Sequence, residues 1–258
     1  MKTQYQNLMK AVLCVALIAF SMGLSATTTV KGNGNVITRD YNVTAFDEIS
    51  TVLPATINYT VSDHYSCRVT LDENLFEYLD IDVNDDHLKL SWLKSLKQVN
   101  VKPTKFIIEI SAPTIEEISL TGSGDFHFLS PFKTDKLEIS SAGSGKVVFD
   151  KDANIRDFEM SIAGSGDLRF EKLVAEIVEL GVAGSGNAII KNGTVKTMEA
   201  SIAGSGSILS CCQLERLDYS IAGSGSISYY GDIEVNGKVV GTGKLKRIDS
   251  KKCKEICE

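Results

Sequence analysis

An acidic side chain stands five residues before the first glycine of each copy of a repeated Gly-Ser-Gly triplet. These acids are Glu117, Glu138, Glu159, Glu179, Glu199 and Asp218. If the copies stack, the carboxylates form a column, and like charges opposite one another are destabilising unless they are solvated, offset by cations or raised in pKa. Two interpretations stay open: a solvated face that opposes aggregation, or a surface that recruits Ca²⁺ or a basic partner. We expect no other cofactor.

A second candidate cluster lies three residues after the first glycines, where Asp125, Lys146 and Asp167 stand. Solenoid lyases cleave acidic polysaccharides with clustered carboxylates, a bound metal and a basic residue, so this trio is the one candidate for catalysis. The equivalent positions in the later copies are Asn187, Ser207 and Ser226. The acidic and basic pattern is therefore not sustained along the repeat.

Other active-site motifs fail on spacing. The segment 142–146, Ala-Gly-Ser-Gly-Lys, lacks the earlier glycine of a phosphate loop and is followed by Val147 instead of Ser or Thr. Every repeat serine is flanked directly by glycine, which excludes the Gly-x-Ser-x-Gly elbow of hydrolases. His64, His87 and His127 are far apart and form no metal-binding pair. We therefore expect no catalytic residues and no enzymatic activity.

The triplets also define the element that positions these side chains. Their first glycines are 21, 21, 20, 20, 19 and 18 residues apart when Gly241-Thr242-Gly243 counts as a degenerate seventh copy. Apolar residues alternate with polar ones on both sides, as Phe158, Met160 and Ile162 do before the third copy. Alternation at period two indicates a strand, a tight corner and a second strand. The corner glycines are Gly122, Gly124, Gly143, Gly145, Gly164, Gly166, Gly184, Gly186, Gly204, Gly206, Gly223 and Gly225.

A unit of this size cannot bury its apolar face alone, so successive units must stack. Glycine accepts positive φ and lets stacked backbones approach closely, which suits the corner. Connections between parallel strands are nearly always right-handed. We predict an all-β protein, a right-handed parallel β-helix or solenoid with coils of about 20 residues that turn at the Gly-Ser-Gly corners.

The first residues predict export. Residues 1–10 carry two lysines and no acid, residues 11–20 are apolar, and residues 21–26 are mostly small, which is the order of a secretory signal peptide. The apolar run is about half of what spans a bilayer, so we expect no transmembrane segment in the mature chain. The predicted location is the periplasm, the cell surface or the medium.

The remaining chain divides into three parts. Residues 27–113 are β-rich without a regular repeat and form an N-terminal cap or irregular coils; residues 114–248 form the solenoid; residues 249–258 are a tail, expected to cap the other end. After export, cysteines often pair, and Cys253 and Cys257 are close enough to form a disulfide. Zinc is disfavoured because no histidine or second cysteine pair lies nearby, and no other metal is assigned.

The formal net charge is −6, which disfavours binding to nucleic acid. Two features identify a resemblance: the segment 43–49, Val-Thr-Ala-Phe-Asp-Glu-Ile, and the block Ser-Ile-Ala-Gly-Ser-Gly at 161–166, 201–206 and 220–225. With the corner spacing, these features resemble the auto-transporter adhesin head domain called the GIN domain family. The resemblance implies a superhelix of β-strands similar to that of pectin lyases, without conserved catalytic residues, and a role in cell adhesion in the Gram-negative envelope.

Three functions follow as hypotheses. The favoured one is an exported envelope protein that binds a glycan or a host or cell-surface protein without catalysis. The second is a pectin-lyase-like protein that binds or cleaves polysaccharide. The third is an envelope scaffold that polymerises end to end, which makes a homo-oligomer the expected assembly.

Overall fold

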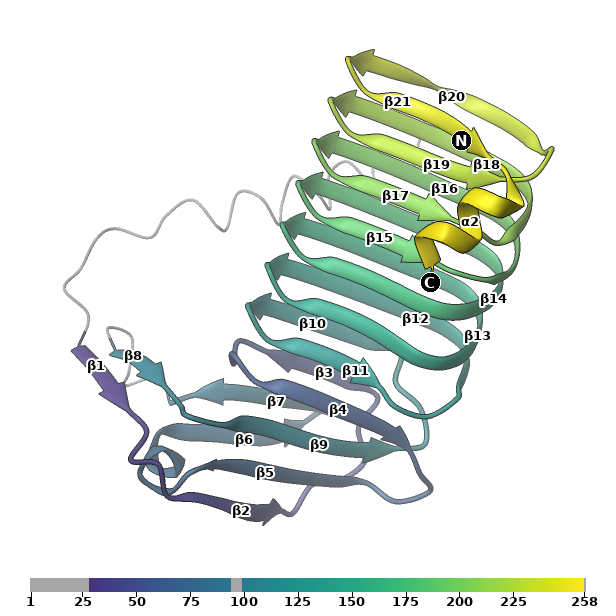
Figure 1. Cartoon of the computed structure of the whole chain (residues 1–258). Coiled ribbons are helices and arrows are strands. Elements are labelled where there is room, and N and C mark those ends of the chain that lie inside the picture. The colour runs from purple at the N-terminus through teal and green to yellow at the C-terminus, as the bar shows by residue number, and fades with distance from the viewer. Residues whose placement is uncertain (1–27, 94–98, 258) are drawn as a thin grey trace.

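The computed structural model describes residues 28–93 and 99–257, so the predicted signal peptide over residues 1–26 lies outside the described residues. The predicted fold class is confirmed: the protein is all-β, with a solenoid of about seven turns over residues 117–248. This solenoid is preceded by a mixed, nearly closed sheet, which forms one end of the molecule, while the last coil of the solenoid forms the other end (Figure 1).

The N-terminal part consists of a mixed sheet, which continues the stacking of the solenoid, and a separate two-stranded parallel sheet formed by the first and eighth strands of the chain. Its elements are β1 (Thr28–Lys31), β2 (Val36–Tyr41), β3 (Glu48–Thr51), β4 (Thr56–Val61), β5 (Ser66–Asp72), η1 (Glu73–Tyr78), β6 (Leu79–Asn84), β7 (His87–Trp92), β8 (Val99–Lys102) and β9 (Phe106–Ala112). Strand β6 pairs antiparallel with β7, and β5 pairs antiparallel with both β2 and β9. Strand β3 pairs parallel with β7, and β4 pairs parallel with β9. Leu75 and Phe76 of η1 are buried and join this core.

The solenoid strands alternate between two sheets. They are β10 (Glu117–Gly122), β11 (Asp125–Phe128), β12 (Phe132–Gly143), β13 (Lys146–Gly164), β14 (Asp167–Gly184), β15 (Asn187–Ile190), β16 (Gly193–Gly204), β17 (Ser207–Ser210), β18 (Gln213–Gly223), β19 (Ser226–Tyr230), β20 (Glu234–Gly241) and β21 (Lys244–Ile248). We call the strands that run into the glycine corners the entry sheet and those that leave them the exit sheet. The long strands β13 and β14 start in the exit sheet, follow the back bend and end in the entry sheet.

The corners lie directly over one another. In the entry sheet Gly122 pairs with Gly143, which pairs with Gly164, and this register continues to Gly241. Gly143 has a φ of 137°, and a Cβ on it would overlap the carbonyl oxygen of Gly122 in the coil below. Glycine is therefore required for its backbone conformation and for the close approach of the coils.

Between the sheets, the inward side chains form one continuous core. Ile139, Met160 and Leu180 occupy matching positions of successive coils, and each is at most 1% exposed. In the exit sheet, the rings of Phe128 and Phe149 stack with centroids 4.0 Å apart, and Phe170 continues this stack at the same spacing. The period-two alternation thus places its apolar set on the inside.

The stacking begins before the first Gly-Ser-Gly triplet. Strand β3 pairs parallel with β10, and β4 pairs parallel with β11, in the register of the later coils. Their corner consists of Val52, Leu53, Pro54 and Ala55. Strand β3 therefore extends the entry sheet and β4 extends the exit sheet, and both strands also belong to the N-terminal part.

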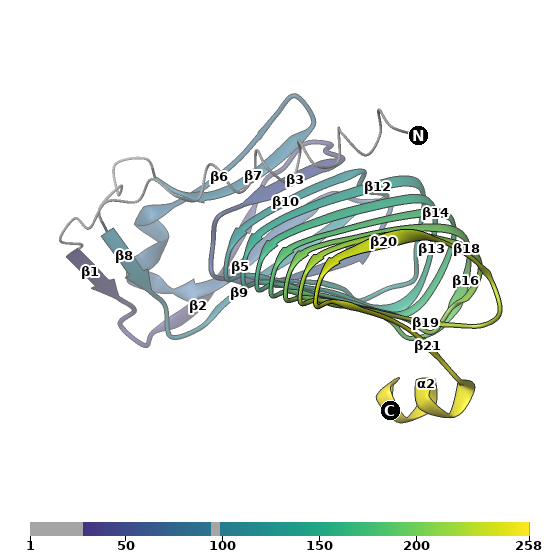
Figure 2. The ribbon, with the colours of Figure 1, turned by 90° about the horizontal axis from the view of Figure 1, so that it is seen from above.

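The coil is right-handed. In Figure 1 the strand β20 runs towards the glycine corner at the left and β21 runs back from it. In Figure 2, seen from the C-terminal end, this path turns counter-clockwise while the chain rises towards the viewer. That is the hand expected from the rule for parallel connections.

The tail differs from the prediction in two ways. It forms the helix α2 (Ser250–Cys257), and Cys253 makes a disulfide with Cys211, whose Cα lies 5.7 Å away. The predicted bridge between Cys253 and Cys257 is therefore wrong, because stacking brings the bend after β17 to the helix within the ordinary Cα separation of a disulfide. The capping prediction is also wrong: α2 lies beside the exit sheet and leaves the end of the solenoid open (Figures 1 and 2). None of the described helices is long and apolar enough to cross a membrane.

Candidate binding face

The structure brings all six predicted acids together in one column on the entry sheet. From β10 to β18 each pairs in register with the next, and Glu48 on β3 extends the column below Glu117. We call this set the acidic column: Glu48, Glu117, Glu138, Glu159, Glu179, Glu199 and Asp218. Glu48 was missed because no glycine triplet follows it, although the tripeptide Glu-Ile-Ser at 48–50 recurs at 117–119 and 138–140.

The alternation of the strand forces the carboxylates outward. In coil after coil, the residues on either side of the acid along the strand point in the opposite direction, as the buried Phe158 and Met160 do around Glu159. The outward positions nearer the corner are small, for example Ser161 and Ala163 in the same coil. The acidic column therefore rises beside a flat strip of small side chains along the entry sheet.

The ends of the acidic column have cationic partners, but its centre does not. Near the N-terminal end, the Lys136 ammonium lies 3.3 Å from Glu138, and at the C-terminal end Arg216 lies 2.7 Å from Asp218. Within the described part of the chain, no ion pair is made by the three central acids, Glu159, Glu179 and Glu199. Three neighbouring carboxylates thus stand without an ion pair, although Lys136 is near enough to offset part of the repulsion on Glu159.

Burial and mutual repulsion act together on this centre. Desolvation, followed by repulsion from Glu138, raises the pKa of Glu159 above its usual range. Desolvation and the flanking carboxylates of Glu159 and Glu199 likewise raise the pKa of Glu179. By contrast, the hydrogen bond from Arg216 lowers the pKa of Asp218. A cationic surface placed over the centre would relieve the repulsion between its carboxylates.

The spacing of the acidic column does not suit the coordination of a Ca²⁺ ion. Ca²⁺ takes six to eight oxygen ligands at about 2.3–2.6 Å, whereas stacked strands hold their side chains about 4.8 Å apart. Over residues 28–93 and 99–257, no group of three or more His, Cys, Asp or Glu side chains could hold a metal ion. A single Ca²⁺ ion at the column would therefore find fewer oxygen ligands than it requires.

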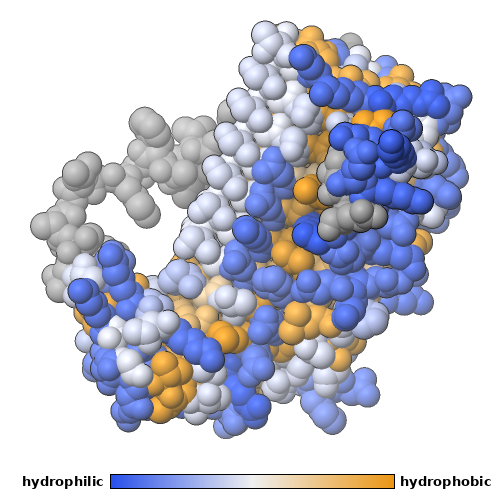
Figure 3. Space-filling view, viewed as in Figure 1, coloured by the Kyte–Doolittle hydropathy of each residue, from blue (hydrophilic) through white to orange (hydrophobic). Residues whose placement is uncertain are grey.

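The trio considered for lyase chemistry is stacked but is occupied by structural contacts. Lys146 pairs with Asp167 in register, and the backbone N–H of Lys146 donates to Asp125 at 2.9 Å. The side-chain amide of Asn187 donates to Asp167 at 2.9 Å. These carboxylates thus fasten one coil to the next. Figure 3 shows the face of the exit sheet, where hydrophilic and hydrophobic residues alternate beside a pale run of residues of intermediate hydropathy along the corner edge.

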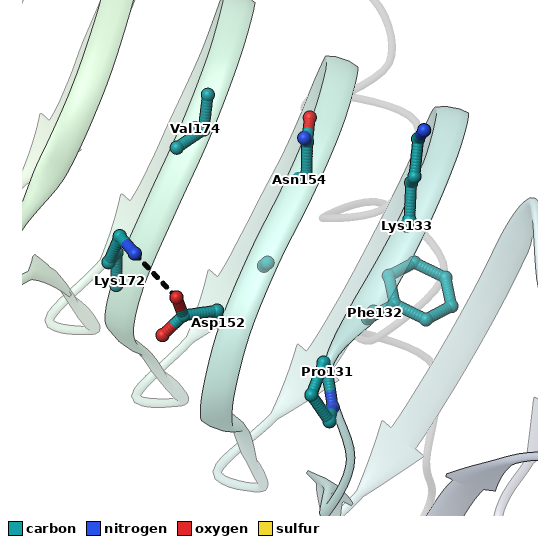
Figure 4. A pocket seen from close by; sticks show the side chains of 8 residues that line it. Pro131, Phe132, Lys133, Asp152, Asn154, Lys172 and Val174 are labelled. Carbon is teal, nitrogen blue, oxygen red and sulfur yellow. Dashed lines mark hydrogen bonds and ion pairs between the residues drawn. The ribbon is translucent and has the colours of Figure 1, made fainter.

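A shallow hollow of about 280 Å³ lies at the back bend, opposite the glycine corners. It is lined by Pro131, Phe132, Lys133, Asp152, Ala153, Asn154, Lys172 and Val174. The Lys172 ammonium forms an ion pair with Asp152 across the neighbouring coils (Figure 4). The one carboxylate among these lining residues is thus engaged in an ion pair.

One protein-family model matches most of the chain. A family model described as "Putative auto-transporter adhesin, head GIN domain" matches residues 45–232. The comparison with curated proteins found no match.

Several solved structures are similar over nearly their whole length. A structure named a putative adhesin from Bacteroides fragilis is 32% identical, with a TM-score of 0.76, covering 85% of this chain and 100% of the other. One named a putative lipid binding protein from Parabacteroides distasonis is 31% identical, with a TM-score of 0.80 and coverages of 86% and 100%. A putative adhesin from Parabacteroides merdae is 26% identical, with a TM-score of 0.73 and the same coverages.

Proposed function

Since this chain belongs to the putative auto-transporter adhesin, head GIN domain family, we propose that it is an exported cell-envelope adhesin that binds a basic partner surface through its acidic column, without catalysis. The family and the disulfide between Cys211 and Cys253 indicate an extracytoplasmic protein. The family found is one of adhesins, and no enzymatic family was identified.

The observation that carries this proposal is the centre of the acidic column, where three stacked carboxylates make no ion pair within the described part of the chain. Stacked like charges reduce the stability of a sheet. Ser or Thr in place of Glu159, Glu179 and Glu199 would therefore serve folding at least as well. The acid nevertheless recurs at this position from β3 to β18, although the coil length changes, and only the last coil has an amide there, Asn236. A partner that supplies cations accounts for acids kept at this position.

The surroundings of the column support a broad, flat partner. The strip of small residues beside it, such as Ser161 and Ala163, presents no side chain that would hold a flat surface away. Lysine or arginine side chains of a host or cell-surface protein, spaced along a strand or helix, would meet several carboxylates at once. A glycan carrying amino groups is the remaining class with the same charge.

The test is a binding screen of the purified protein on glycan arrays and on immobilised matrix proteins, with a column variant and a matched control. The column variant is Glu159→Gln, Glu179→Gln and Glu199→Gln. The control removes the same charge from exposed acids elsewhere, in the variant Asp63→Asn, Glu77→Gln and Glu215→Gln.

We expect the unmodified protein and the control to retain ligands whose binding weakens with salt, and the column variant to lose them. Loss in both variants would show that net charge alone drives binding. Equal retention by both variants would refute the acidic column as the binding face. Detection of unsaturated products from a uronate polymer would overturn the non-catalytic reading.

A further inference from the structure

The hollow of about 280 Å³ at the back bend lies between two rows of outward side chains (Figure 4). One row runs over three successive coils, from Lys133 to Asn154 and Val174, which pair in register. The other row contains Asp152 and Lys172, which also pair in register. The hollow is therefore a short groove along the stacking direction, and we call it the back-bend groove. Two steps between coils give it a length of about 10 Å.

The walls of the back-bend groove are largely apolar although they face solvent. Val174 is 38% exposed in one row, and Pro131 is exposed in the other. The stems of the two lining lysines add methylene groups to both walls. In the next two coils, the position of Val174 is occupied by Thr194 and Gln213. Valine thus brings apolar surface into a row that is otherwise polar, and it does so at the groove.

An irregularity of the strand shapes this groove. Three residue steps on β13, from Phe149 to Asp152, match two steps on β14, from Phe170 to Lys172. Such an extra residue bends the strand and re-aims the neighbouring side chain, and bulges of this kind are common beside active sites. The side chain that follows the bulge is that of Asp152, which forms its ion pair with Lys172. These two charges of the groove are therefore balanced.

One cation of the back-bend groove stays without a counter-charge. Among the residues that the structure describes, none forms an ion pair with Lys133. The acid two residues further on, Asp135, is engaged by Arg156 at 3.5 Å. Asn154 stands beside Lys133 in the next coil, and its side-chain amide carries two N–H donors. The groove thus combines apolar walls with a free ammonium and an adjacent amide donor.

We propose that the back-bend groove binds a short straight-chain fatty acid as its carboxylate. The chain would lie along the apolar walls, and the two carboxylate oxygens would accept from the Lys133 ammonium and the Asn154 amide. A cationic ligand would find only Asp152, which already pairs with Lys172. Small-molecule pockets measure about 300–1,000 Å³, so this volume suits a ligand at the small end. The inference does not depend on the proposed function, because the groove shares no residue with the acidic column.

Binding can be measured by NMR, from the chemical shift changes that sodium hexanoate causes in the purified, ¹⁵N-labelled protein. Hexanol is the matched probe, because it has the same chain without the charge. Two variants change the groove at exposed positions, Lys133→Gln and Val174→Ser. Their controls are Lys151→Gln, at an exposed lysine outside the lining, and Val240→Ser, at an exposed valine of the last coil. Circular dichroism melting checks that each variant folds.

We expect hexanoate to bind with a Kd of about 1 mM or below and to shift the backbone amide signals of Asn154 and Val174. Hexanol should bind about fivefold more weakly, as the loss of a partly exposed ion pair predicts. Lys133→Gln should remove this preference for hexanoate over hexanol, whereas Lys151→Gln should keep it. Val174→Ser should weaken both probes by about threefold through lost apolar contact, and Val240→Ser should weaken neither.

Any of four results would overturn the proposal. Hexanoate could cause no shift up to about 10 mM, ten times the expected limit of the Kd. Its shifts could fall on residues outside the lining of the groove, or hexanol could bind as tightly as hexanoate, and neither result needs a variant. A folded Lys133→Gln protein could also keep the preference for hexanoate.

Discussion

Replacing Glu159 with Gln at the centre of the acidic column should stabilise the fold at neutral pH. Glu159 faces Glu138 and Glu179 in the neighbouring coils, and each like-charged cross-strand pair costs about 0.2–1 kcal/mol. Removing two such pairs gives a gain of about 0.4–2 kcal/mol, towards the lower end because the column is partly solvated. For a chain of this length, 1 kcal/mol corresponds to a rise in Tm of about 2–4 °C.

The pH dependence gives this prediction its sign. The pKa of Glu159 is raised in the folded state by desolvation and then by Glu138, so folded Glu159 holds its proton to a higher pH than unfolded Glu159 does. The repulsion is therefore absent below the unfolded pKa of about 4.3 and fully present above the folded pKa. Tm of the variant should match that of the unmodified protein at acidic pH and exceed it at pH 8.

The assay is thermal unfolding followed by circular dichroism at several pH values and at two salt concentrations. The control is Glu176→Gln, which removes an acid whose pKa is lowered by its contact with Lys196 at 2.8 Å, and which should bring no gain at pH 8. A Glu159→Gln protein that is no more stable at pH 8, or one whose advantage is the same at every pH, would refute the repulsion on which the proposed binding face depends.

Two further predictions concern the corner and the tail. Gly164→Ala should lower the free energy of unfolding by about 3 kcal/mol or more in urea titration, because φ is 126° and the new Cβ would overlap the carbonyl oxygen of Gly143. The exposed Ser165→Ala should change it by less than about 0.5 kcal/mol, and similar losses in both would contradict the close-approach argument. Cys253→Ser should cost about 2–4 kcal/mol and make the tail sensitive to limited proteolysis, as reduction should in the unmodified protein; unchanged cleavage would contradict a tethering role.

The solenoid was predictable because its signals are local and repeated. Period-two alternation around each glycine triplet indicates two strands and a corner, and the constant distance from acid to glycine predicts the column once stacking is assumed. The first coil lacks this signal, because Val52 to Ala55 form its corner without glycine. Its place became visible only through the pairing of β3 with β10, which joins residues about 70 positions apart.

The tail was not predictable from spacing, because its partner is set by the stacking of distant coils. Cys211 and Cys253 are 42 residues apart in sequence, whereas Cys257 is only four residues from Cys253. Sequence proximity therefore favoured the wrong pair, and disulfide connectivity does not follow from sequence alone. The open end of the solenoid follows from the same contact, since a helix held at Cys211 lies beside the exit sheet.

The coil length falls from 21 to 18 residues along the chain, yet the acidic column stays in register because the shortening occurs elsewhere. Eight residues, 129–136, separate Phe128 from Leu137 in the first back bend, but only five, 230–234, separate Tyr229 from Val235 in the last. The acid and its glycine lie on the same entry strand, so a change in the back bend cannot shift one relative to the other. The fold thus tolerates changes of length in the back bend while the entry sheet keeps its acids in register. A repetitive binding surface requires this regular spacing.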